Sequence, residues 1–247
     1  MNVVLLGDSN TWIGGDSCNL ARGWNKWFRD ELAPASCRSY ARSGATWTNT
    51  EATVNTTSEY TEKLGDNNVV YNQINRLAEA VAEGRQPVPD MILIAAGTND
   101  AWFSAKRPLA FAKTADEAFA AITDDEGGGA DITSRPAGSI LTLAEAVRYG
   151  CTMLQKAYPD AMIIVLTPLR STAVPDKSIR TAGDIMEECC RKMGVGVIRQ
   201  DGNDFISPKQ ERRHKRFTTD GTHTNEAGAR HNARLITSAV RAMLHAR

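Results

Sequence analysis

Residues 3–10, Val-Val-Leu-Leu-Gly-Asp-Ser-Asn, constrain the fold of this chain more than any other stretch. Four consecutive apolar residues that end at a glycine are typical of a central parallel strand covered on both faces. The acid, the hydroxyl and the amide that follow then lie at the carboxyl end of that strand, where open α/β sheets place their ligands. Ser9 is therefore a candidate nucleophile, although capping a helix explains the same serine equally well.

The rest of the chain alternates apolar strands with helical patterns, which predicts an α/β fold with a parallel sheet and helices on both faces. We expect one domain over residues 1–247, because no second core or internal repeat is present. Residues 48–68 are polar and predict an excursion over the surface, and residues 103–140 predict an exposed insertion at the catalytic edge. The predicted strands are 3–6, 37–41, 91–96, 162–167 and 196–199, and the predicted helices are 20–32, 70–83, 112–122, 142–158, 179–193 and 225 onward.

Composition narrows the class of partner. The chain has 29 basic and 29 acidic residues, so no overall field favours nucleic acid or an anionic membrane. No apolar run is long enough to span a membrane, and because the first strand is predicted to begin almost at Met1, we expect no export signal in the sequence as given. We expect a small-molecule partner and, on the sequence as given, a cytoplasmic location, or an exported one if a leader has been removed.

Five cysteines without a Cys-x-x-Cys pair indicate neither a disulfide framework nor a zinc site. If the protein is exported, the sequence is also compatible with a disulfide between Cys18 and Cys37.

A single site would explain four polar segments of the chain. They are Ser9, Gly44, Asn99, and residues 219–223 before the last helix. Three of them follow predicted strands and should therefore meet at one edge of the sheet. A serine needs an imidazole to take its proton, and a carboxylate to orient that imidazole, as Asp220 and His223 can do. A backbone N–H beside a glycine and a side-chain amide suit the oxyanion.

These segments resemble the SGNH hydrolases, also called GDSL esterases/lipases. Gly7-Asp8-Ser9, Gly44, Gly97-Thr98-Asn99-Asp100 and Asp220-Gly-Thr-His223 match the four blocks of that family, in family order. The sequence departs from the family pattern at Asn10, where Leu or Ile is usual, at Thr224, where proline often follows the histidine, and at Ser43. The Gly-x-Ser-x-Gly elbow of α/β-hydrolases is absent.

The resemblance implies an α/β/α sandwich with a flavodoxin-like sheet and a catalytic set that requires no metal or organic cofactor. It implies Ser9 as nucleophile, His223 as general base and then acid, and Asp220 as its orienting acid. It implies an oxyanion hole from the N–H groups of Ser9 and Gly44 and the amide of Asn99. We therefore expect a serine esterase that removes a small acyl group, most simply acetyl from a carbohydrate.

Three tryptophans, Trp12, Trp47 and Trp102, each stand three residues after a proposed site residue. Indole rings suit stacking on sugars or forming the wall of an acyl pocket, so we expect them to line the entrance to the site, although each could instead anchor the start of its own helix. The remaining histidines, His214, His231 and His245, are expected at the surface.

The same residues are compatible with three other kinds of protein. A lipid acyl esterase, lysophospholipase or thioesterase would use the same mechanism. A metal-dependent phosphoesterase could use Asp8, Asp100, Asp220 and His223 as ligands. A carbohydrate-binding protein could use the tryptophans without turnover.

Overall fold

The computed structural model describes the whole chain except residues 51, 58–66, 106, 121–130, 203 and 247. Its centre is a five-stranded sheet in the order β2-β1-β3-β4-β5, and every pair of neighbouring strands is parallel. This is the flavodoxin-like strand order. The predicted α/β fold is confirmed, with strands β1 (Asn2–Gly7), β2 (Ser36–Ser39), β3 (Met91–Ala95), β4 (Met162–Leu166) and β5 (Gly196–Ile198).

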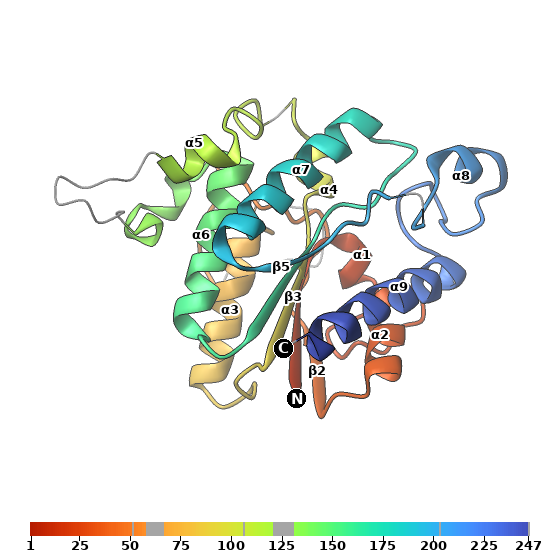
Figure 1. The fold of residues 1–247 in the computed structure, drawn as a ribbon, viewed down its shortest axis with the longest axis horizontal. Coiled ribbons are helices and arrows are strands. Elements are labelled where there is room, and N and C mark those ends of the chain that lie inside the picture. The colour runs from red at the N-terminus through yellow and green to blue at the C-terminus, as the bar shows by residue number, and fades with distance from the viewer. Residues whose placement is uncertain (51, 58–66, 106, 121–130, 203, 247) are drawn as a thin grey trace.

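Helices cover both faces of the sheet (Figure 1). On one face, Val4, Leu6, Ile92 and Ile94 share a buried cluster with side chains of α3 (Val70–Ala82), α6 (Leu143–Ala157) and α7 (Asp176–Met193). On the other face, the alternate residues Val3, Leu5, Met91 and Leu93 pack with α2 (Trp24–Leu32) and α9 (Glu226–His245). Continuous apolar strands follow from this arrangement, because successive side chains point to opposite faces and both faces are buried.

The shorter helices are at the ends of strands and in the connections. Helix α1 begins two residues after β1, and α4 begins three residues after β3, at the carboxyl edge of the sheet. These elements are α1 (Ser9–Trp12), α4 (Thr98–Trp102), α5 (Ala115–Ala120), the 3₁₀ turns η1 (Ile132–Ser134) and η2 (Ala137–Ser139), and α8 (Pro208–His214).

The first long helix is shorter than predicted. It begins at Trp24, after Gly23, and Leu20 is 55% exposed in the preceding turns. A Cβ on Gly23 would lie 2.2 Å from the Cα of Gly14, so only glycine permits this close approach of the chain to itself. The prediction of a helix from residue 20 was wrong because helical spacing of apolar residues does not reveal such a turn.

Two predicted surface segments contain buried parts. Thr48 and Asn49 are buried, so the segment 48–68 does not begin on the surface, and much of its remainder, residues 58–66, lies outside the described residues. In the segment 103–140, Ile132 and Ile140 are buried in the main cluster, which corrects the expectation of an exposed loop there. The three glycines at 127–129 lie outside the described residues.

None of the helices in the described part of the chain combines the length and hydrophobicity needed to cross a bilayer.

Candidate active site

The turn between β1 and α1 requires a glycine. A Cβ on Gly7 would lie 2.4 Å from the carbonyl oxygen of Ala95 on the neighbouring strand, so any side chain would collide with backbone. The buried side chain of Gln73 on α3 fixes the same glycine, because its Oε1 accepts from the Gly7 N–H at 2.8 Å and its Nε2 donates to the Gly7 carbonyl at 2.9 Å. Ser9 therefore begins its helix from a rigid strand end.

Asp8 caps that helix from a buried position. Its Oδ1 accepts a hydrogen bond from the N–H of Asn10 at 3.1 Å, and the carboxyl group is only 3% exposed. Burial raises the pKa of Asp8 to about 6, against the opposing effects of hydrogen bonds from Asn10 and Thr98 and of the nearby His223. The acid beside Ser9 therefore keeps its proton to a higher pH than an exposed aspartate does.

A second turn, before α9, holds the acid and the imidazole. One oxygen of Asp220, Oδ1, accepts from the backbone N–H groups of Thr222 at 2.9 Å and of His223 at 2.7 Å. Gly221 has φ +92°, and a Cβ there would lie 1.8 Å from Thr172 Oγ1, so glycine is again required. The turn therefore leaves the second carboxylate oxygen, Oδ2, to face the imidazole.

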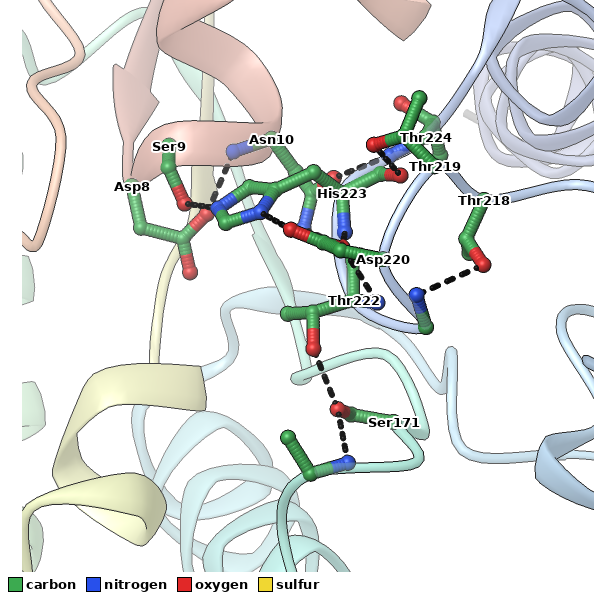
Figure 2. A network of polar contacts seen from close by, with 12 residues as sticks. Asp8, Ser9, Asn10, Ser171, Thr218, Thr219, Asp220, Thr222, His223 and Thr224 are labelled. Carbon is green, nitrogen blue, oxygen red and sulfur yellow. Dashed lines mark hydrogen bonds and ion pairs between the residues drawn. The ribbon is translucent and has the colours of Figure 1, made fainter. Parts of the chain in front are cut away.

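Three side chains of these two turns form a continuous line of contacts (Figure 2). Nε2 of His223 lies 2.9 Å from Oγ of Ser9, and Nδ1 lies 2.6 Å from Oδ2 of Asp220. Partial burial raises the pKa of Asp220, but the hydrogen bonds from His223 and Thr222 outweigh it and bring the pKa to about 2. The carboxylate is therefore ionised at neutral pH, and the line joins a hydroxyl, an imidazole and a carboxylate in that order.

Donors for a negative oxygen lie on the neighbouring strand ends. Gly44 has φ +73°, and within the described residues neither its N–H nor that of Ser9 donates a hydrogen bond to the protein. Asn99, buried on α4, donates one N–H of its amide to the carbonyl of Ala45 at 2.9 Å. An amide nitrogen carries two N–H groups, so one donor of Asn99 is left for a ligand.

Asp100 holds the loop that carries Gly44. Its buried carboxylate accepts from the backbone N–H groups of Trp47 and Thr48, both at 3.0 Å, and from the Thr48 hydroxyl at 2.7 Å. Burial raises the pKa of Asp100, and these hydrogen bonds lower it in part. Both carboxylate oxygens of Asp100, a ligand in the metal-dependent alternative, therefore already accept hydrogen bonds from the loop.

Asn10 connects the nucleophile helix to the histidine turn. Its amide nitrogen donates to the carbonyl of Thr222 at 3.3 Å, and its oxygen accepts from the N–H of Thr224 at 3.2 Å. These two residues flank His223 (Figure 2). Two of the three residues that depart from the family pattern, Asn10 and Thr224, therefore bond to each other and join the two halves of the site.

The three tryptophans do not share one position. Trp47 is only 2% exposed and packs in the main core beside Ile74 and Gly150, so its predicted place at the entrance is wrong. Trp102 is 39% exposed and stacks on Phe103, whereas Trp12 is half-buried. Three residues of spacing bring a side chain near the site but do not decide which way it points.

Two supporting residues were not anticipated. Gln73 reaches Gly7 from 66 residues along the chain, and no local pattern indicates such a contact. Glu211 of α8 is buried and accepts from the N–H groups of Phe217 and Thr218, which orders the start of the histidine turn. Gln73 lies among apolar residues in a helical pattern. That pattern indicates that its amide is buried, but not which group it contacts.

The remaining histidines lie apart from this line. His214 and His245 are exposed as predicted, but His231 is half-buried and stacks on Phe217 at a centroid distance of 4.7 Å. Among the residues that the structure describes, no group of three or more His, Cys, Asp or Glu side chains is arranged to hold a metal ion.

Comparisons agree with this architecture. A sequence model described as the GDSL-like lipase/acylhydrolase family matches residues 5–231. Among curated protein sequences, none is similar enough to this chain to match it. Many solved structures have a similar fold, among them the following three, which match over nearly their whole length. A protein from Lactobacillus plantarum is 16% identical, with a TM-score of 0.60 over 98% of this chain and 96% of that one. The lipase/acylhydrolase from Enterococcus faecalis is 16% identical, with a TM-score of 0.56 over 98% and 97%. The acetyl xylan esterase AlAXEase is 16% identical, with a TM-score of 0.58 over 97% and 100%.

Proposed function

The chain belongs to the GDSL-like lipase/acylhydrolase family, whose enzymes hydrolyse ester bonds, and we propose that it is a serine esterase acting through Ser9, His223 and Asp220. The observation that carries this proposal is the line of contacts from Ser9 Oγ through the imidazole to the Asp220 carboxylate, at 2.9 and 2.6 Å. Both distances are within the range in which a proton passes between heavy atoms.

In the proposed acylation step, Ser9 Oγ attacks the acyl carbon while its proton passes to Nε2 of His223. The ionised Asp220 keeps the other proton on Nδ1 and stabilises the imidazolium that forms. The charge that develops on the carbonyl oxygen is met by the N–H groups of Ser9 and Gly44 and by the second N–H of Asn99.

The tetrahedral intermediate then collapses. His223 returns its proton to the leaving alcohol oxygen, and the acyl group stays on Ser9. A water molecule attacks this acyl-enzyme while His223 takes its proton. The second tetrahedral intermediate then collapses, His223 returns that proton to Ser9 Oγ, and the free acid leaves.

For the substrate we propose an acetylated carbohydrate. The similar fold of AlAXEase, an acetyl xylan esterase, supports this choice. The exposed indole of Trp102, three residues after Asn99 on α4, offers a stacking surface for a sugar ring.

A cavity favours a second candidate, hydrolysis of a longer acyl ester. It has a volume of about 360 Å³ and is lined in part by Ala52, Pro108, Leu109 and Leu141. Its wall also includes Asn49 and Thr50, which continue directly from the loop held by Asp100. Arg107 completes the wall, and the four apolar residues suit a hydrocarbon chain better than a sugar.

A screen of p-nitrophenyl esters from acetate to palmitate, beside acetylated xylan oligosaccharides, separates these candidates. We expect the highest kcat/KM on acetyl esters of the oligosaccharides. A maximum at medium or long acyl chains would instead assign the enzyme to the second candidate.

Chelation and covalent labelling test the mechanism itself. We expect activity to survive EDTA and to be lost when a serine-directed organophosphonate modifies Ser9, as located by peptide mass spectrometry. Loss of activity on chelation with recovery on adding a divalent ion would contradict the proposal.

A further inference from the structure

A pair of thiols lies where the loop that follows α1 meets the edge strand β2. Sγ of Cys18 and Sγ of Cys37 are 3.6 Å apart, although the two residues belong to different elements. Cys18 is fully buried, whereas Cys37 on the edge strand is half-buried.

The positions of both sulfurs are fixed by the surrounding backbone. Cys18 has φ +53°, uncommon for a residue with a side chain, and its N–H donates to the carbonyl of Gly15 at 3.0 Å. The carbonyl of Asp16 accepts from the N–H of Ser39 on β2 at 2.8 Å, which ties the loop to the strand beside the thiols. The short distance is therefore a property of the loop geometry.

The other three cysteines do not share this setting. Cys151, Cys189 and Cys190 are all buried in the cluster on the opposite face of the sheet, and Cys189 donates its S–H to the carbonyl of Ala144.

We propose that Cys18 and Cys37 form a disulfide by exchange with a disulfide-bearing oxidant. The sulfurs must approach by about 1.6 Å to reach bonding distance, a shift that rotation of two side chains provides. The bond would fasten the loop from α1 to an edge strand that is hydrogen-bonded to the sheet on one side only.

The exchange balances in two steps. The Cys37 thiolate attacks one sulfur of the oxidant and releases the other as a thiolate, and the Cys18 thiolate then attacks Cys37 and releases the second. The pair loses two electrons, the oxidant gains them, and the two thiol protons pass to the released thiolates. The Cys18 contact and burial raise the pKa of Cys37, so little thiolate is present and the exchange is slow near neutral pH.

The test uses the full chain, treated with oxidised glutathione at pH 8.5 or with dithiothreitol. After denaturation we expect the free thiols to fall from five to three in the oxidised sample. Trypsin cleaves between the two cysteines, so the cross-link joins peptide 1–22 to peptide 30–38, which reduction separates.

Cys37→Ser is the main control, because its side chain is half-buried and the hydroxyl is smaller than the thiol. This variant should keep its four remaining thiols under the same oxidant. The wild-type Tm should rise on oxidation by roughly 5–10 °C, as expected for closing a loop of this length, and the variant should show no rise. Five thiols remaining in the oxidised wild type, or a cross-link mapped to any other pair, would overturn the proposal.

Discussion

The side-chain oxygen of Asn10 accepts a hydrogen bond from the backbone N–H of Thr224 at 3.2 Å, across 214 residues of sequence. Because Asn10 follows the proposed nucleophile and Thr224 follows the proposed base, this bond sets the distance between them. The amide of Asn10 also donates to the carbonyl of Thr222, so the backbone of His223 is held on both sides.

Replacing Asn10 should therefore slow the reaction without weakening substrate binding. Asn10→Leu removes both hydrogen bonds, and we expect kcat to fall about 10- to 100-fold with little change in KM, since small displacements of reacting groups are costly. Asn10→Asp keeps the acceptor for Thr224 and loses the donor to Thr222, so its kcat should be intermediate. Steady-state kinetics on p-nitrophenyl acetate measure both variants, and an unchanged kcat in Asn10→Leu would remove this role.

Asn99 is assigned to charge that exists only in the transition state. Asn99→Ala should lower kcat by about 10²–10³ while KM changes little. The same variant also loses the bond to Ala45, so its Tm must be measured beside its kinetics. A rise in KM with kcat preserved would make Asn99 a substrate-binding residue instead.

Asp8 makes stability depend on pH. Its pKa in the folded protein, about 6, lies above the ordinary value of 3.8, so the folded state holds this proton more tightly than the unfolded chain does. The stabilising contribution is complete below about pH 4 and is lost as pH rises through 6, by roughly 3 kcal/mol for a shift of this size.

Asp8→Asn removes that titration while keeping an oxygen to cap α1. Between pH 4 and pH 7.5, the free energy of unfolding of Asp8→Asn should fall less than that of the wild type. His223 and Asp100 are the ionisable groups that act on Asp8, and both remain in the variant. Urea unfolding at the two pH values measures the difference, and parallel profiles for the two proteins would contradict the assigned cause.

Trp47 and Trp102 lead to opposite predictions, because the first is buried and the second is exposed. Trp47→Ala creates a cavity in the core and should cost about 3–5 kcal/mol of stability. Trp102→Ala should leave Tm nearly unchanged but lower kcat/KM on an acetylated oligosaccharide by roughly 5- to 100-fold, with a much smaller effect on p-nitrophenyl acetate. Equal losses on both substrates in Trp102→Ala would show that the indole does not contact the sugar.

The strands and the edge of the sheet were predictable because their signals are local. Apolar runs such as 91–96 end at glycines, and a parallel sheet brings the residues after them to one edge, where α1 and α4 begin. Leu20 and Trp47 were misplaced because spacing along the chain does not give the direction of a side chain when glycine turns intervene. Asn10 and Gln73 were invisible as supports, because each bonds to backbone far away in sequence.

The central claim is that Ser9 is the nucleophile, and it is tested most directly by hydrolysis of p-nitrophenyl acetate by wild type and Ser9→Ala at equal concentration, with circular dichroism confirming that both are folded. Ser9 Oγ is 2.9 Å from His223 Nε2, and no other hydroxyl in the described residues occupies that place. We predict that the folded variant loses the enzymatic rate and retains at most a residual rate about 10³–10⁴ above that in water alone. A folded Ser9→Ala enzyme with near-wild-type turnover would contradict the account.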